Sequence, residues 1–412
     1  MRMPVVRSTF LVLLLALAGA LVACSPAAST PAATPRPRAF ETPSPPATPQ
    51  GQAPDDDTIA TTLLAAGIMP TQWRTDFTKR SVPLEEIVSG GPRKDGIPAI
   101  DNPKFVPVAE ASSWLAPREP VLALELNGDV RAYPVQVLIW HEIVNDVVGG
   151  RPVAVTYCPL CNTAIVFDAA LPDGRQVTFG TTGNLRFSDL VMYDRQTESW
   201  WQQITGEAIV GELVGSRLRF IPASMVSWDE FMKAHPDGKV LSKATGYPLP
   251  YGENPYLGYD TRQPFLYQGP EDNRLTAIER VVTVAVGEEA VAFPFSVLEK
   301  EPVVHYTLGE QSFVVFYRMG TTSALDTTDI AQGRDVGATG VFVPRADGRT
   351  LTFRAHGEEI VDNETDSTWN LLGEAVSGPL KGQRLEPVLH ANHFWFSWAV
   401  FKPHTKVYRG QE

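Results

Sequence analysis

Two cysteines three positions apart are the residues of this chain with the clearest capacity for chemistry. Cys158 and Cys161 form a Cys-Pro-Leu-Cys motif between two strand-like runs, residues 153–157 and 164–167. Thiol-exchange motifs usually lie at the start of a helix instead, where the N-terminus lowers the pKa of the attacking sulfur. A strand, a tight turn and a second strand are typical of a metal-binding knuckle, in which two thiolates converge on one ion.

A histidine is predicted to lie opposite the first of these cysteines. The Gly-Gly pair at positions 149 and 150 is typical of a two-residue hairpin turn, because glycine readily adopts the positive φ angles that such a turn needs. If Val148 pairs with Arg151 across this turn, the same register places His141 opposite Cys158. Directly opposed residues have Cβ atoms about 4.5 to 5.5 Å apart, close enough to bind one metal ion together.

The sequence therefore predicts a metal site with His141, Cys158 and Cys161 as its protein ligands. Two thiolates and an imidazole suit zinc, and three protein ligands with an open fourth position are usual at catalytic zinc. Thiolates also suit Cu(I), so zinc and copper are both candidates. Two other interpretations stay open: a thiol-disulfide redox protein that uses the cysteine pair, and a non-catalytic binding or scaffold module. Whether the chain is an enzyme stays open as well.

Other polar residues could support the ligands. Glu142 follows the predicted histidine ligand, and Asp189 and Asp194 follow a glycine-containing segment, so each could orient a ligand or act as a base. His390 and His393 also have a spacing that occurs in metal sites. Because no third ligand lies near them in the sequence, we interpret these two histidines as packing or hydrogen-bonding residues.

The elements that would position these residues are mostly strands. Runs of alternating or β-branched residues, separated by turn residues at short intervals, predict a β-rich fold with a few short helices. Motifs of the first half recur in the same order in the second, which predicts two similar halves from an internal duplication. The matching segments are Ala132-Tyr133-Pro134 with Ala292-Phe293-Pro294, Asp173-Gly174-Arg175 with Asp347-Gly348-Arg349, Asp194 with Asp362, and Trp228 with Trp398.

The predicted duplication divides the folded part of the chain. The first repeat, which carries the histidine and both cysteines, is placed at residues 121–245. A degenerate second repeat is placed at residues 281–410, with residues 246–280 as a connector. Residues 55–120 are predicted to pack on the first repeat.

The second repeat lacks the candidate ligands. Glu301 and Arg318 stand where the first repeat has His141 and Cys158, and Thr321 stands at the position of the second cysteine. An acid and a base at two opposed positions predict an ion pair across the hairpin. The sequence therefore predicts a single metal site, in the first repeat.

The N-terminus has the features of a bacterial lipoprotein signal. Arg2 and Arg7 precede an apolar run, residues 10–23, which is short for a bilayer span because spanning needs about 20 apolar residues. The run ends in Leu21-Val22-Ala23-Cys24, which resembles the lipobox of exported lipoproteins. Residues 1–23 are therefore predicted to be a signal peptide that is removed.

Lipid on Cys24 is expected to hold the mature chain on the extracytoplasmic face of a membrane. Residues 24–54 are rich in Pro, Ala, Ser and Thr, a composition that forms semi-rigid tethers. Residues 55–412 carry 31 basic and 46 acidic side chains, a formal charge of −15. An acidic chain of this kind is not expected to bind nucleic acid or an anionic lipid surface, which require basic surfaces.

Four longer segments have distinctive motifs: Asp95–Pro103, Trp140–Asp146, Tyr157–Cys161 and Asp189–Trp200. Together they resemble an exported protein family known as domain of unknown function 3179, over about residues 70–410. The resemblance implies an exported protein of bacteria or archaea. It implies no particular activity, substrate or partner.

Overall fold

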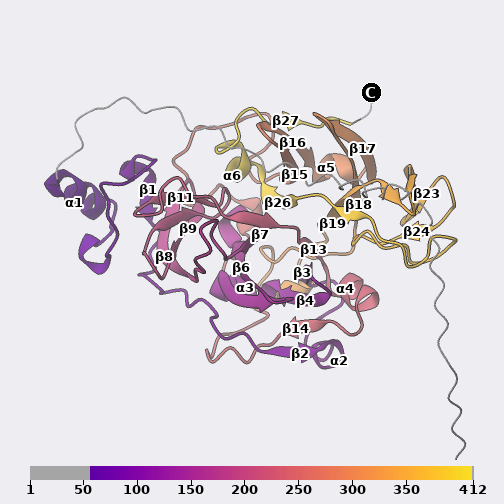
Figure 1. The fold of residues 1–412 in the computed structure, drawn as a ribbon, viewed down its shortest axis with the longest axis horizontal. Coiled ribbons are helices and arrows are strands. Elements are labelled where there is room, and N and C mark those ends of the chain that lie inside the picture. Colours follow the sequence, from indigo (N-terminus) through magenta and orange to yellow (C-terminus); the bar gives the residue numbers. More distant parts are fainter. Residues whose placement is uncertain (1–55, 411–412) are drawn as a thin grey trace, which may run out of the picture. The chain divides into compact units, whose positions relative to one another are not determined.

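Strands make up most of the regular structure in the computed structural model, which describes residues 56–410 (Figure 1). The chain is mainly β, with 39% strand and 15% helix, so the prediction of a β-rich fold with short helices is confirmed. The predicted signal peptide, Cys24 and the tether lie outside the described residues.

Three sheets contain the strands of residues 87–241. Their strand orders are β1-β8-β9-β10-β11, β12-β7-β6-β5 and β13-β3-β4-β14-β2. The strands are β1 (Ile87–Ser89), β2 (Phe105–Pro107), β3 (Pro120–Leu126), β4 (Asp129–Pro134), β5 (Ile143–Val148), β6 (Arg151–Cys158), β7 (Thr163–Asp168), β8 (Phe179–Arg186), β9 (Asp189–Asp194), β10 (Trp200–Gln202), β11 (Glu207–Val210), β12 (Arg219–Ile221), β13 (Ser224–Ser227) and β14 (Lys239–Leu241).

Four sheets contain the strands of residues 280–407. Their strand orders are β26-β15-β16-β27, β17-β18-β19-β25, β22-β23-β24 and β20-β21. The strands are β15 (Arg280–Val286), β16 (Glu289–Pro294), β17 (Val303–Leu308), β18 (Gln311–Arg318), β19 (Ala338–Val343), β20 (Arg345–Ala346), β21 (Arg349–Thr350), β22 (Phe353–His356), β23 (Glu359–Asp362), β24 (Thr368–Trp369), β25 (Glu386–Pro387), β26 (His390–Phe394) and β27 (Lys406–Val407).

The helices are short, and several begin directly after a strand. The α-helices are α1 (Asp56–Ala65), α2 (Val108–Ala111), α3 (Val135–His141), α4 (Trp228–Ala234), α5 (Phe295–Leu298) and α6 (Trp395–Ala399). The 3₁₀ turns are η1 (Pro70–Gln72), η2 (Leu84–Glu86), η3 (Pro159–Cys161), η4 (Tyr259–Thr261) and η5 (Ile330–Gln332).

The β5–β6 hairpin has the predicted register. Val148 pairs with Arg151, and the ladder continues from there without a bulge to the start of β5. Gly149 and Gly150 both have positive φ angles, as a two-residue turn requires. A Cβ at position 149 would lie 2.1 Å from the Leu126 carbonyl oxygen, so glycine is also needed there for space. Strands β17 and β18 pair Leu308 with Gln311, which is the register implied by the prediction that Glu301 and Arg318 oppose each other.

The largest apolar core holds the β6–β7 hairpin in place. Val155 of β6 and Phe167 of β7 are fully buried there, together with Phe394 of β26. Strand β26 contacts β7 directly, so the strands after residue 280 meet the first half beside the cysteines (Figure 1). At ~25 cal/mol per Å² of apolar surface, burial of this kind is the main force that fixes the hairpin.

A separate apolar cluster joins the segment after residue 56 to the sheet of β9, β10 and β11. Ile59 and Leu63 of α1 and Ile87 of β1 are buried against Val191 and Trp200. The segment therefore covers the sheet that contains β9, from which one of the site residues comes.

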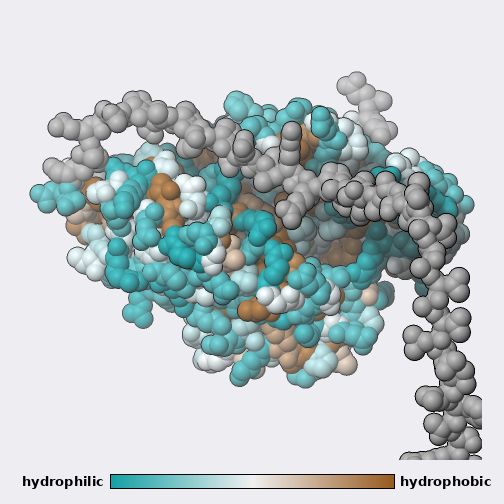
Figure 2. All heavy atoms as spheres, viewed as in Figure 1, coloured by the Kyte–Doolittle hydropathy of each residue, from teal (hydrophilic) through white to brown (hydrophobic). Residues whose placement is uncertain are grey.

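The surface of the described part is largely polar. On the face seen in Figure 2, hydrophilic side chains predominate and hydrophobic ones form small separate patches. None of the helices in residues 56–410 combines the length and the apolar composition needed to cross a bilayer.

Candidate metal centre

The two cysteines lie at the ends of one tight connection between strands. Cys158 is the last residue of β6, and Cys161 is the last residue of η3. Asn162 then adopts a left-handed conformation, with φ of 51°, which lets Thr163 begin β7 paired with Cys158. The predicted strand, tight turn and strand are confirmed, and both thiols are free and buried.

A carboxylate from the neighbouring sheet completes the group. Asp189 is the first residue of β9 and is fully buried. The Sγ atoms of Cys158 and Cys161 and a carboxylate oxygen of Asp189 all lie within 4.8 Å of one another. This is the group of three His, Cys, Asp or Glu side chains within residues 56–410 whose ligand atoms lie close enough to hold a metal ion.

The thiols and the carboxylate converge on the same small space. Sγ of Cys158 and Sγ of Cys161 both donate to the carbonyl oxygen of Ser188, at 3.8 and 3.5 Å. Sγ of Cys161 also lies 3.3 Å from Oδ1 of Asp189. Each thiol proton lies between a sulfur atom and an oxygen atom. A cation in the same space could replace these protons and bind the sulfur and oxygen atoms directly.

The two oxygens of Asp189 have different partners. Oδ2 accepts hydrogen bonds from Nε2 of Gln202, at 2.5 Å, and from the backbone N–H of Ile204, at 3.0 Å. Oδ1 faces the thiol of Cys161. Donors that hold one oxygen fix the other in place, which is the role of outer-shell hydrogen bonds around a ligating carboxylate.

Burial disfavours charge on every member of this group. Desolvation raises the pKa of the Cys158 and Cys161 thiols, and it raises the pKa of Asp189 to about 6. Desolvation, aided by the negative charge of Asp189, also raises the pKa of nearby Glu142 to about 8. Four acidic groups thus share a buried region in which a cation would be strongly stabilised.

His141 lies outside this group, and the prediction that it faces Cys158 across the hairpin is wrong. The β5–β6 ladder starts at Ile143, because the helix that follows Pro134 continues through His141 and ends at Glu142. Glu142 has φ of 57°, a turn that separates the helix from the strand. The sequence pattern did not reveal that the helix extends this far.

Both ring nitrogens of His141 already have partners. Nδ1 lies 2.6 Å from the carbonyl oxygen of Pro98, and Nε2 lies 2.6 Å from the hydroxyl of Tyr251. A carbonyl can only accept, so Nδ1 carries the proton and Nε2 accepts from the tyrosine. Burial lowers the pKa of His141, which favours this neutral form. These contacts describe a structural histidine, and ligation by His141 stays a prediction.

Glu142 lines a cavity next to the cysteines. The cavity has a volume of about 220 Å³, and Leu160 and Leu190, which adjoin the ligand residues in the chain, also line it. Asn184 lines it too, and its Nδ2 is buried with no hydrogen-bond partner. Glu142 is therefore close enough to Asp189 to feel its charge, and it also lines a space that could hold a small molecule.

Asp194, expected to support the ligands, serves a turn instead. Its carboxylate accepts from the backbone N–H of Thr197 at 2.6 Å and from Nε1 of Trp201 at 3.0 Å. Asp362 accepts from Thr365 and Trp369 at 2.6 and 2.9 Å in the same way. Since Asp362 lies in the half without cysteines, this arrangement is structural.

Sequence reasoning missed the strained turn that brings Asp189 to the thiols. Phe187 and Ser188 form the two-residue loop between β8 and β9, with φ angles of 53° and 65°. Glycine or asparagine is usual at such positions, so neither residue signalled this turn. Strained backbone of this kind gathers at functional sites. Phe187, Ser188, Glu142 and Asn162 are four of the ten non-glycine residues with positive φ among the described residues.

The predicted connector, residues 246–280, also contributes to the site. Tyr251 holds His141, and Tyr256 and Tyr259 line the cavity beside Glu142. Burial raises the pKa of Tyr256 and of Tyr259, and the nearby cysteine thiols add to that effect. The segment that the sequence analysis treats as a connector thus forms part of the wall of the site.

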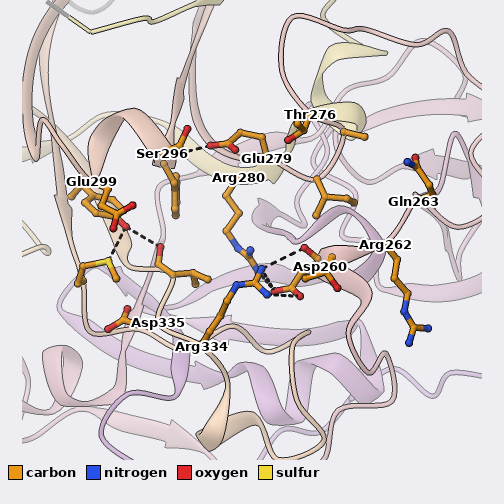
Figure 3. A pocket seen from close by; sticks show the side chains of 17 residues that line it. Asp260, Arg262, Gln263, Thr276, Glu279, Arg280, Ser296, Glu299, Arg334 and Asp335 are labelled. Carbon is orange, nitrogen blue, oxygen red and sulfur yellow. Dashed lines mark hydrogen bonds and ion pairs between the residues drawn. The ribbon is translucent and has the colours of Figure 1, made fainter.

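A larger polar pocket, of about 640 Å³, is lined in part by a network of ion pairs (Figure 3). The buried carboxylate of Asp260 accepts from Arg280 at 3.0 Å and from Arg334 at 2.9 Å, and the hydroxyl of Ser323 donates to it. Because one carboxylate satisfies two guanidinium groups, these side chains are already matched to one another. The network ties the connector to the second half and includes neither cysteine.

The second half has no thiols at the corresponding place. Arg318 ends β18 and forms an ion pair with Glu230 of α4, a partner that the sequence did not suggest. Glu301, the expected partner, accepts a hydrogen bond from the hydroxyl of Tyr408 at 2.9 Å. The ion pair of Arg318 thus joins β18 to α4 of the first half, which the predicted pair across the hairpin did not anticipate.

A family of proteins of unknown function, DUF3179, matches residues 94–405. The chain belongs to this family. The matched range includes Glu142, Cys158, Cys161 and Asp189, so the candidate site lies wholly within the family domain. Comparison with the curated proteins gives no significant match, and comparison with the solved structures also gives none.

Proposed function

We propose that this chain is an exported lipoprotein, anchored through Cys24, whose DUF3179 domain binds one metal ion with Cys158, Cys161 and Asp189. The convergence of two buried thiols and one buried carboxylate oxygen within 4.8 Å carries the proposal. A divalent ion would take the place of the protons and offset the cost of burying these acids together. The lipobox-like sequence before Cys24 supports the location.

Zinc fits this ligand set better than copper. Zinc binds Cys, His and carboxylate ligands in tetrahedral sites, whereas Cu(I) prefers sulfur ligands alone. Zinc–sulfur bonds of ~2.3 Å hold two sulfurs about 3.8 Å apart in a tetrahedron. The two sulfurs would therefore need to draw together by about 1 Å at most from their present spacing. Glu142, which lines the adjoining cavity, or a small molecule in that cavity would supply the fourth ligand.

The burial of the thiols weighs against a thiol-exchange role. Exchange requires an accessible thiolate, and exchange catalysts lower the pKa of the attacking cysteine. Here burial raises the pKa of both thiols, and both side chains are shielded from solvent. A metal site uses the same burial to exclude competing water.

An internal duplication accounts for the restriction of this site to one half. The sheet β12-β7-β6-β5 has the same succession of strands along the chain as β25-β19-β18-β17, and β13-β3-β4-β14 corresponds to β26-β15-β16-β27. These correspondences, with the recurring sequence motifs, support two repeats of one unit. On this reading the second repeat has lost, or never acquired, the ligands.

Metal content tests the proposal directly. The full-length chain, purified in detergent without oxygen and without an affinity tag, is expected to contain about one zinc per chain. Cys161→Ser and Asp189→Asn are expected to lose it, because each removes one of three ligands from the ion. Inductively coupled plasma mass spectrometry measures the content.

A matched variant in the second half controls for this loss. Thr321→Ser changes the residue that corresponds to Cys161 and should keep a full complement of zinc. Circular dichroism spectra of all variants confirm folding. A wild-type chain that stays free of metal after incubation with zinc or copper, with a Cys158–Cys161 disulfide found by mass spectrometry, would contradict the proposal.

A further inference from the structure

His393 has a buried nitrogen without a partner. The side chain is almost completely shielded from solvent, and its Nε2 makes no hydrogen bond within the described residues. The ring stacks on Trp398, with centroids 4.9 Å apart and planes 24° apart, so its orientation is fixed. Leaving a buried polar atom unpaired costs about 1 to 3 kcal/mol, so such atoms call for an explanation.

The neighbours of His393 decide which kind of partner its Nε2 requires. Nδ1 lies 2.7 Å from the hydroxyl of Thr163, and that hydroxyl donates its own proton to the carbonyl oxygen of Cys161 at 3.2 Å. With the single hydroxyl proton on that carbonyl, the threonine oxygen accepts from Nδ1–H, and Nε2 is left as a bare acceptor. Burial lowers the pKa of His393 to about 3, so the ring keeps this neutral form at physiological pH.

A cavity of about 180 Å³ lies against this ring, between the two halves of the fold. His393 and Ala391 share one face of β26, and Thr283 of β15 pairs with Ala391. Strands β7 and β12 of the first half form the opposite wall, and most of the lining is aliphatic or aromatic. The lining residues are Ala164, Ile165, Val166, Ile204, Phe220, Ile221, Ala223, Thr283, Ala285, Leu389, His390, Ala391, His393 and Trp398.

We infer that this cavity binds a small, largely apolar molecule that donates one hydrogen bond to Nε2 of His393. A volume near 180 Å³ suits a molecule with one ring, since an engineered cavity of about 150 Å³ binds benzene. A hydroxyl group is the donor that fits best, because it can also accept a hydrogen bond from the hydroxyl of Thr283, which lines the same wall.

This inference is independent of the proposed metal. The cavity lining contains neither cysteine nor Asp189, although Thr163 links His393 to the carbonyl of Cys161. A single water molecule would leave most of this lining uncovered, because the lining is mainly apolar and the cavity has several times the volume that one water needs.

Phenol and anisole provide a matched pair of probes, since they share a ring and differ in the hydroxyl proton. In equilibrium dialysis of the full-length chain, with the same detergent on both sides, phenol should bind at one site about tenfold more tightly than anisole. In His393→Phe, phenol should lose this advantage because the acceptor is gone. In Ala391→Leu, which fills the cavity, neither probe should bind above the detergent background.

Zinc content should stay the same in both variants, which separates this test from the metal proposal. If His393→Phe does not fold, the wild-type comparison of the two probes and the Ala391→Leu variant still decide the matter. Equal affinity of phenol and anisole for the wild type would overturn the inference. So would equal uptake by wild type and Ala391→Leu, which would leave ordered water as the partner of Nε2.

Discussion

The hairpins β8–β9 and β22–β23 have the same kind of buried aspartate at the end of their second strand, which we call the corner aspartate. The two hairpins differ in the length of their strands. At the base of each, a buried aspartate, Asp194 or Asp362, accepts hydrogen bonds from a threonine and a tryptophan. Strand β9 has six residues and β23 has four. Strand β9 begins with Asp189, which is buried beside the thiols, whereas β23 begins with Glu359, which is exposed to solvent.

The connections that follow β6 and β18 also differ in length. Residues 159–162 join β6 to β7 in a single 3₁₀ turn, with a cysteine at each end of the motif. Residues 319–337 join β18 to β19, and there the carboxylate of Asp335 accepts from the backbone N–H groups of Gly320, Thr321 and Gly337. The candidate ligands thus occur beside the longer of the two hairpins and the shorter of the two connections.

The corner aspartates should contribute equally to stability if the framework is common. Asp194→Ala and Asp362→Ala are each expected to lower the free energy of unfolding by about 4 kcal/mol, because each leaves buried donors without an acceptor. Urea unfolding with zinc chelated measures the framework alone. A large effect in only one half would break the comparison.

Much of the fold could be predicted from the sequence. The Gly149-Gly150 pair and the alternation around it gave the correct register of β5 and β6, because side-chain alternation fixes which face of a strand is buried. The same reasoning placed β17 opposite β18. Local turn chemistry and periodicity therefore determined the hairpins well.

The site was only partly predictable. Spacing identified the cysteines, since a strand–turn–strand connection brings them together within one hairpin. His141 was misplaced because the length of α3 depends on tertiary packing rather than on local pattern. Asp189 was named only as a supporting residue, because its approach depends on contact between two sheets and on a turn with unfavourable residues at positions 187 and 188.

Two buried histidines, one in each half, should respond differently to acid. His141 has partners on both nitrogens, whereas His393 has one. The pKa of His393 is lowered from 6.5 to about 3 in the folded chain, so its contribution to stability is complete above pH 6.5 and is lost as the pH falls. Lowering the pH from 7 to 5 should therefore reduce the free energy of unfolding by about 2 kcal/mol through this histidine.

The measurement is the difference in unfolding free energy between pH 7 and pH 5, by urea titration, for the wild type and His393→Phe. The variant should lose about 2 kcal/mol less than the wild type, since it has no ring to protonate when the chain unfolds. His141→Phe should remove less of the pH dependence, because the backbone carbonyl of Pro98 partly offsets the lowering of that pKa. Identical pH profiles for wild type and His393→Phe would show that this ring is protonated while folded.

The smallest expected effect, on zinc content, comes from introducing a second pair of cysteines without a third ligand. Arg318→Cys with Thr321→Cys installs the motif at the corresponding place in the second half, and the chain should still hold only about one zinc. The longer connection there is held by Asp335, and the carboxylate that begins β23, Glu359, is exposed to solvent, whereas Asp189 is buried. Two zinc ions per chain in this variant would show that thiol spacing is sufficient. One zinc would show that the extended β8–β9 hairpin is what makes the cysteine motif a site, because it delivers the third ligand and its strained turn.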